Sequence, residues 1–96
     1  MNKENKRLVY LLFACDEWKG KDSMRLVSVA VVPTKIRQAV EWQIRLGNMT
    51  YKGDTNKSAA AQVREFRSDW KTKTRNVLND NLCGGFLDTM YEGEEY

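Results

Sequence analysis

The stretch LVYLLFA, residues Leu8–Ala14, decides the fold of this chain. Its length, its apolar character and its β-forming residues are typical of a strand buried inside a sheet. A charged segment that contains Gly20 comes next, and a second β-forming run extends over residues 24–32. Two such runs joined by a long polar loop predict an antiparallel β-hairpin.

Helical periodicity follows the second run. Apolar residues recur at helical spacing over residues 35–46, which predicts a helix with Thr34 as its N-cap. Arg37, Glu41 and Arg45 stand four apart on what we expect to be the outer face of this helix. At that spacing they can pair with one another, so none of them requires a ligand.

The middle of the chain predicts a short strand and a longer helix. Residues 49–52 have the composition of an edge strand, and the helix is expected to begin near Asn56 or Ser58. Its end is open, because the β-branched residues Thr72 and Thr74 lower the helix propensity there. Either the helix continues through them, or Thr74 caps a new, third helix.

The C-terminal part completes the predicted sheet. Gly84-Gly85 ends the helical region, and residues 86–91 have the composition of a last strand. The simplest arrangement is an α+β fold, a small antiparallel sheet of three to four strands in ββα(β)ααβ order with two to three helices packed on one face. With 96 residues, 42% of them hydrophobic, the chain is expected to form a single domain over residues 1–96.

Charge is distributed unevenly along the chain. The formal net charge is +3, but residues 35–75 carry ten Lys and Arg against four Asp and Glu, whereas residues 80–96 carry five acids and no base. A basic middle attracts polyanions, and the acidic end repels them or folds back on the basic part. Four residues near the end form a candidate acidic patch for a basic partner: Asp88, Glu92, Glu94 and Glu95.

Cys15 and Cys83 are the only cysteines, and two cysteines do not make a disulfide framework. We expect both thiols to be reduced and buried. No charged leader followed by an apolar stretch opens the chain, and the apolar run Leu8–Cys15 is far too short to cross a bilayer. The expected compartment is the cytoplasm, without a membrane partner.

Catalytic chemistry has few residues to work with. The chain has no histidine, which removes the commonest general base and the commonest metal ligand. Asp16 and Glu17 follow Cys15, and their charges raise the pKa of its thiol, whereas a nucleophile needs a lowered pKa. The two cysteines also lack the close spacing of zinc sites. We therefore expect no enzyme activity, no cofactor and no metal.

Basic residues recur with the helix turn in the longer helical segment. At about 100° per residue, five of them lie within about 80° of one another, and we call these the basic stripe: Lys57, Arg64, Arg67, Lys71 and Arg75. The stripe can face a phosphate backbone or an acidic protein, or it can be an ordinary solvated helix face. If the helix breaks at Thr72 to Thr74, Arg75 leaves the stripe.

The loop between the first two strands places Trp18 in a charged segment, and Arg25 stands where the second strand begins. Trp and Arg are enriched at binding hot spots, so both are candidate partner-binding residues. Two alternatives remain for the tryptophan. Its side chain either folds back over the sheet or is offered to a partner.

The same loop carries a resemblance. An apolar strand is followed by Cys-Asp-x-Trp-Lys at residues 15–19, then by Ser-Met-Arg-Leu at residues 23–26 and a second strand. In these features, over roughly its first third, the chain resembles small uncharacterised accessory proteins of bacterial phages and mobile elements. The resemblance implies a small protein without catalytic motifs that binds a host protein, as anti-CRISPR inhibitors do.

Two functions are therefore expected candidates. The first is a non-enzymatic protein-binding module that inhibits or modulates a bacterial protein or ribonucleoprotein complex, such as a defence or nuclease complex. The alternative is a small nucleic-acid-binding protein that uses the basic stripe. A homodimer, formed through an exposed strand edge or through Trp42 and Leu46 of the first helix, is compatible with either function.

Overall fold

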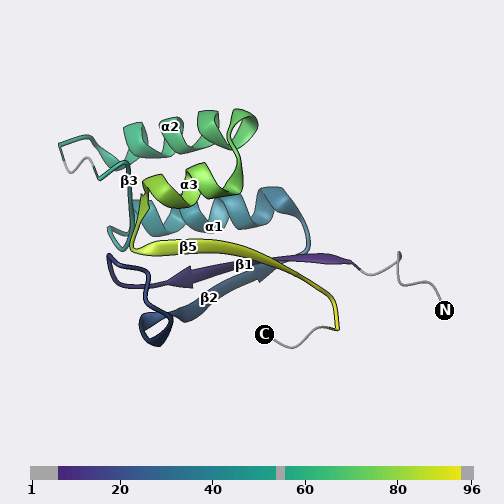
Figure 1. Cartoon of the computed structure of the whole chain (residues 1–96). Coiled ribbons are helices and arrows are strands. Elements are labelled where there is room, and N and C mark those ends of the chain that lie inside the picture. Colours follow the sequence, from purple (N-terminus) through teal and green to yellow (C-terminus); the bar gives the residue numbers. More distant parts are fainter. Residues whose placement is uncertain (1–6, 54–55, 94–96) are drawn as a thin grey trace.

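A three-stranded antiparallel sheet forms one layer of the computed structural model, which describes residues 7–53 and 56–93 (Figure 1). β1 (Leu8–Ala14) is the central strand, flanked by β2 (Arg25–Ala30) and β5 (Gly85–Tyr91). It runs antiparallel to both neighbours. The predicted hairpin, the added last strand and the α+β class are thereby confirmed.

Three helices lie on one side of this sheet. α1 (Pro33–Arg45) packs directly on the first two strands, and α3 (Arg75–Asn81) packs beside β5. α2 (Ala59–Thr72) lies over α1, farther from the sheet, as Figure 1 shows. A separate two-stranded sheet joins β3 (Thr50–Tyr51) to β4 (Leu82–Cys83), so the predicted edge strand pairs outside the main sheet.

Proline rather than threonine sets the start of α1. The helix begins at Pro33, and the extended residue Val32 is its N-cap, so the expectation that Thr34 caps the helix is wrong. The fixed φ of proline suits the first helical position, and its missing N–H is not needed there. Thr34 therefore lies inside the first turn.

The chain breaks between α2 and α3. Lys73 is extended, with φ −107° and ψ 157°, and it ends α2. The next residue, Thr74, is the N-cap of α3, and its Oγ1 accepts the N–H of Val77 at 3.3 Å. Of the two alternatives left by the sequence, the third helix is therefore the one that forms. As a consequence Arg75 belongs to α3 and does not continue the basic stripe along α2.

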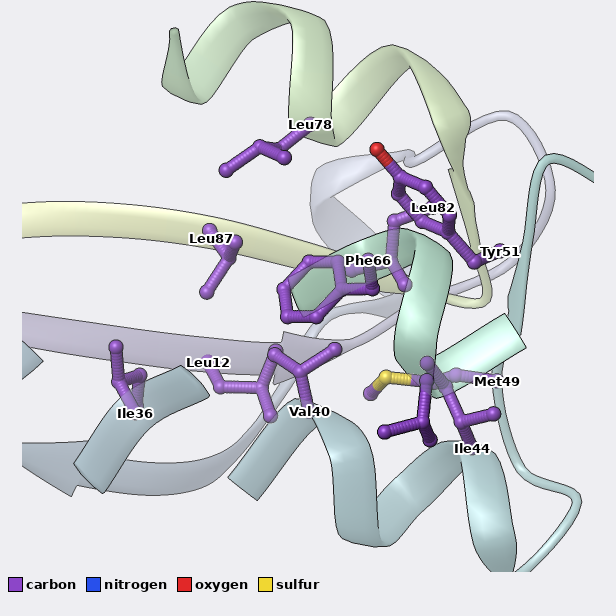
Figure 2. Packing of buried hydrophobic residues seen from close by; sticks show 11 residues of the cluster. Leu12, Ile36, Val40, Ile44, Met49, Tyr51, Phe66, Leu78, Leu82 and Leu87 are labelled. Carbon is purple, nitrogen blue, oxygen red and sulfur yellow. The ribbon is translucent and has the colours of Figure 1, made fainter. Parts of the chain in front are cut away.

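The core lies between the sheet and the helices. Side chains alternate along the strands, and Leu12 of β1 and Leu87 of β5 point toward the helices. There they join Ile36 and Val40 of α1 and Phe66 of α2, as Figure 2 shows. All five are buried, and burying one such side chain stabilises the fold by about 1.5–3 kcal/mol.

Two glycines allow β4 and β5 to meet the segment after α1 closely. Gly84 has φ +85°, and a Cβ there would lie 2.9 Å from the carbonyl oxygen of Asn48. A Cβ on Gly85 would lie 2.5 Å from the Sδ atom of the buried Met49. Gly84 therefore requires glycine, whereas a larger residue at Gly85 would require the Met49 side chain to move. The corner formed by the two glycines lies beside the loop between β1 and β2.

Glu41 lies inside the molecule, and its expected place on the outer face of α1 is wrong. Its side chain is only 2% exposed. It accepts two hydrogen bonds from Arg67 of α2, from Nε at 3.1 Å and from Nη2 at 2.8 Å, and Arg37 Nε lies 3.0 Å away as an ion pair. Because α1 is covered both by the sheet and by α2, the helix face with Glu41 meets α2, whereas Arg45 stays exposed.

Both cysteines are free thiols, but they are not both buried. Cys15 is half-buried, and burial is the main cause that raises the pKa of its thiol; Asp16 also raises it, whereas Lys19 lowers it. Cys83 is exposed, so the expectation of burial is wrong there. In the two-residue strand β4 its neighbour Leu82 points into the core, which turns Cys83 outward.

Candidate functional site

The loop between β1 and β2 is closed by its own hydrogen bonds. The N–H of Asp16 donates to Ser23 Oγ at 3.0 Å, and the N–H of Gly20 donates to Asp16 Oδ1 at 3.0 Å. Ser23 Oγ in turn donates to the Gly20 carbonyl at 2.7 Å, next to a short 3-10 turn at Lys21–Ser23. These bonds connect the two ends of the loop and restrict its conformations.

Lys19 attaches this loop to the rest of the fold. Its backbone adopts φ +54°, and its Nζ donates to the carbonyl oxygens of Leu82 at 2.5 Å and Gly85 at 2.6 Å. Both acceptors belong to the corner between β4 and β5. A charged donor shared by two backbone carbonyls is a strong tether, since such bonds exceed neutral ones in strength.

Trp18 is the most exposed large apolar side chain described, at 81%. It stands immediately before the tethered Lys19, in the loop that joins β1 to β2. This loop lies at the left of Figure 1. Of the two alternatives for this residue, the side chain is therefore directed into solvent and does not cover the sheet.

Arg25 occupies a different place from Trp18. It is the first residue of β2, pairs with Ala14 of β1 and is exposed. Together with Gln43 and Asn48, it lines a shallow hollow beside the C-terminal end of α1.

The face of the sheet away from the helices is largely apolar. Because Leu12 points toward the helices, Leu11 and its cross-strand partner Val29 point to the other side. No described helix covers that side (Figure 1). We call this surface the open sheet face, and the register assigns to it Val9, Leu11, Phe13, Leu26, Val29, Phe86 and Met90, together with one charged residue, Asp88, opposite Leu11. Leu11 and Phe13, on the central strand, are buried among their neighbours.

The β2 edge of this surface is its most exposed part. Leu26 is 55% and Val29 52% exposed, and the strand carries no charged side chain after Arg25. Sequence reasoning did not single out these residues. The signal was present, because both alternating sets of β2 contain apolar residues, whereas a strand covered on one face alternates apolar with polar residues.

Two residues of the basic stripe are bound to carboxylates of the protein itself. Lys57 lies before α2 and donates to Glu65 Oε1 at 2.9 Å, while Lys52 donates to Glu65 Oε2 at 2.8 Å. Hydrogen bonds from these lysines lower the pKa of the Glu65 carboxyl. The two bonds between Arg67 and Glu41 raise the pKa of the Arg67 guanidinium. The positive charges of Lys57 and Arg67 are therefore partly neutralised within the protein.

A third member of the stripe, Arg75, is also engaged. Its Nη1 donates to Thr89 Oγ1 at 2.6 Å and lies 3.6 Å from Asp88 Oδ1. Arg64 and Lys71 are exposed on α2. The structure therefore does not bring the five residues together as one open row, and two of them present the cationic surface of α2.

The acidic patch is likewise divided. Asp88 lies within β5, where its Oδ1 accepts the N–H of Thr89 at 2.8 Å beside Arg75. Glu92 follows the strand and is exposed. Glu94 and Glu95 lie outside the described residues.

Within residues 7–53 and 56–93, no three side chains of Cys, Asp or Glu gather in a group that can hold a metal ion. The raised pKa of Cys15 keeps its thiol protonated near neutral pH, which does not favour nucleophilic chemistry. None of the helices in these ranges combines the length and the apolar character that crossing a bilayer requires.

Comparisons of the chain with protein-family models, with curated proteins and with solved structures find no match. The function is therefore inferred from the geometry of the chain.

Proposed function

We propose that the protein is a non-enzymatic protein-binding module and that Trp18 anchors the contact with the partner. The carrying observation is the exposure of this tryptophan, 81%, on a loop that Lys19 holds in place. Tryptophan is among the residues that contribute most to binding when a partner buries them. A loop that is already ordered loses little further conformational entropy on binding.

The open sheet face supplies further contact area next to this anchor. Phe13 and Phe86 of the sheet line one hollow together with Lys19 and Met24 of the loop, so the loop and the face are continuous. Exposed apolar surface of this kind is typical of protein interaction sites. A partner that receives Trp18 in a pocket can cover the neighbouring part of the sheet as well.

We infer a bacterial defence or nuclease complex as the class of partner, which the protein would inhibit or modulate. Support comes from the resemblance to phage and mobile-element accessory proteins, because the residues that carry it, 15–26, form the loop held by Lys19 and the first two residues of β2. The basic residues Arg64 and Lys71 suit an acidic surface on such a complex.

Nucleic-acid binding is the second candidate, and the exposure of Arg64 and Lys71 is the observation in its favour. The other three members of the basic stripe already bind groups of the protein. Neutralisation of two phosphates would give a log-log salt slope of only about −1.8 on duplex DNA. Such binding would be weak at physiological salt.

The test is affinity capture from a bacterial lysate, with and without nuclease, by the tagged wild-type protein and by Trp18→Ala. Trp42→Ala is the matched control, because it removes another exposed tryptophan, 59% exposed, from α1 instead of the loop. We expect one stoichiometric protein that survives nuclease, is retained by Trp42→Ala and is lost with Trp18→Ala.

Two outcomes contradict the proposal. If Trp18→Ala retains the partner as well as the wild type does, the tryptophan is not the anchor. If instead nuclease removes everything that is bound and Arg64→Glu abolishes retention, the nucleic-acid function replaces the protein-binding one.

A further inference from the structure

An apolar pocket is lined by residues from the start of α1, the end of α2, the start of α3 and the strands β1 and β5. These helix ends lie away from the loop between β1 and β2, at the right of the helices in Figure 1. Its volume is about 460 Å³. Small-molecule sites in proteins commonly have volumes of roughly 300–1,000 Å³. The pocket is therefore large enough for a small organic ligand.

The pocket lies at the break between α2 and α3. Its lining includes Trp70 from the last turn of α2, Arg75 from the start of α3 and Pro33 from the start of α1. Ile36, Leu78 and Leu87 are buried side chains that form its apolar lining.

Aromatic side chains extend this lining toward the opening. Trp70 from the last turn of α2 is half-buried, and its ring lies 5.8 Å from that of Phe66, a contact that holds the indole in place. Tyr10, also half-buried, contributes from β1. Two aromatic rings beside aliphatic residues favour a ligand with an apolar body, an aromatic one included.

The charged groups around the pocket leave an excess of one positive charge. Lys73 and Arg75 contribute two cations, and Asp88 contributes one carboxylate. Arg75 lies 3.6 Å from Asp88, and one of its five N–H donors is used by Thr89. Within the described residues the ammonium group of Lys73 has no hydrogen bond or ion pair, so it can receive an anionic group.

We propose that this pocket binds a small organic monocarboxylate, with the apolar body between Trp70 and Leu87 and the carboxylate at Lys73 and Arg75. One negative charge balances the excess of one positive charge around the pocket. A neutral ligand would leave Lys73 unpaired, and an ammonium ligand would be repelled. This site is independent of the proposed function, because it lies at the other end of the fold from Trp18.

The test is an NMR titration of the full ¹⁵N-labelled chain with 4-phenylbutyrate, compared with 4-phenylbutanol and 4-phenylbutylamine. We expect the carboxylate to shift the Trp70 indole signal and the amides of Lys73, Arg75 and Leu87. A charge-assisted hydrogen bond should make the alcohol bind about tenfold more weakly, and the amine should bind more weakly still. Trp18→Ala should bind 4-phenylbutyrate as the wild type does.

Lys73→Glu and Lys71→Glu form a matched pair, because they make the same charge change two positions apart and only Lys73 lines the pocket. Both side chains are exposed, and the amide spectrum reports whether the fold is retained. Lys73→Glu should weaken binding about tenfold or more, and Lys71→Glu should change it less than about twofold.

Three results overturn the proposal. One is equal binding of the acid and the alcohol. Another is an equal effect of the two lysine variants, which would indicate unspecific attraction of anions to the surface. The third is the absence of shifts at the pocket with about 10 mM ligand, a concentration at which a ligand with a Kd of about 1 mM would occupy about nine tenths of the sites.

Discussion

Glu41 is a carboxylate with almost no exposed surface, and its replacement tests how far the contact between α1 and α2 depends on one residue. Glu41→Gln keeps the shape of the side chain but leaves Arg67 and Arg37 without their anion. Because the Arg67 side chain is nearly half exposed and can be hydrated, we expect the free energy of unfolding to fall by only about 1–3 kcal/mol.

Urea unfolding of Glu41→Gln gives the measurement, and Arg45→Ala on the exposed face of the same helix is the control. The control should stay within about 0.5 kcal/mol of the wild type. An equal effect of the two variants would mean that the buried ion pairs contribute nothing that a neutral amide does not.

Tyr51 predicts how stability changes at high pH. Its hydroxyl donates to Asp69 Oδ2 at 2.7 Å, and burial, followed by this bond, raises the pKa of the phenol. The unfolded chain loses the phenol proton near its ordinary pKa of about 10, whereas the folded chain retains it. Below about pH 10 the phenol therefore makes its full contribution to the free energy of unfolding. As the pH rises above that value, this free energy falls by about 1.4 kcal/mol per pH unit.

Tyr51→Phe isolates this effect from the other groups that titrate in the same range. Above about pH 10 the stability of the wild type should fall with pH more steeply than that of the variant. The difference in slope should correspond to one proton released on unfolding. At neutral pH the variant should lose about 1 kcal/mol for the missing hydrogen bond. Parallel pH curves for the two proteins would show that Tyr51 ionises equally in the folded and unfolded chains.

Local signals made most elements predictable. The apolar run Leu8–Ala14 coincides with β1, and the expected hairpin and last strand pair with it. Ser58 and Thr74, each of which the sequence offered as one of two alternatives for the start of a helix, are the N-caps of α2 and α3. These features depend on a few adjacent residues, whose preferences the tertiary structure does not override.

The tether of the Trp18 loop and the pocket at the other end could not be predicted in the same way. Lys19 binds carbonyls more than sixty positions away, and backbone acceptors carry no residue-type signal. A spacing of four residues indicates that Arg37 and Glu41 share a helix face, but not that α2 covers it. Such features depend on the relative placement of whole elements.

Thr74→Ala tests the independence of α3 as a helix. In the wild type, Thr74 Oγ1 accepts the N–H of Val77 at the long distance of 3.3 Å. We therefore expect the substitution to lower the free energy of unfolding by about 0.5–1 kcal/mol, the lower part of the range for N-caps. Thr72→Ala, at the last residue of α2, is the control and should be neutral or slightly stabilising, since alanine favours helix. Chemical denaturation distinguishes the two variants, and equal stability would mean that the cap contributes nothing.

At the scale of the molecule, three surfaces are separate. The loop with Trp18 lies at one end of the sheet, and the helix ends that line the pocket beside Lys73 lie at the other end (Figure 1). The open sheet face is on the side of the sheet away from the helices. The helices shield only one side of the sheet. A chain of this size, with one sheet face uncovered, has a strong tendency to bury that face against another protein.

In the absence of a partner, we expect that tendency to appear as self-association through β2. This edge strand offers unpaired backbone groups, and an antiparallel edge can pair with a second copy about a two-fold axis. Val29→Lys places a charge in the middle of the edge and should yield a monomer, whereas Gln38→Lys, the same charge change on an exposed position of α1, should associate as the wild type does. Analytical sedimentation over a wide range of protein concentration measures the self-association of each variant. A wild type that stays monomeric throughout contradicts the expectation, because the edge would then be protected by its own twist at the irregularity between Leu12 and Phe13.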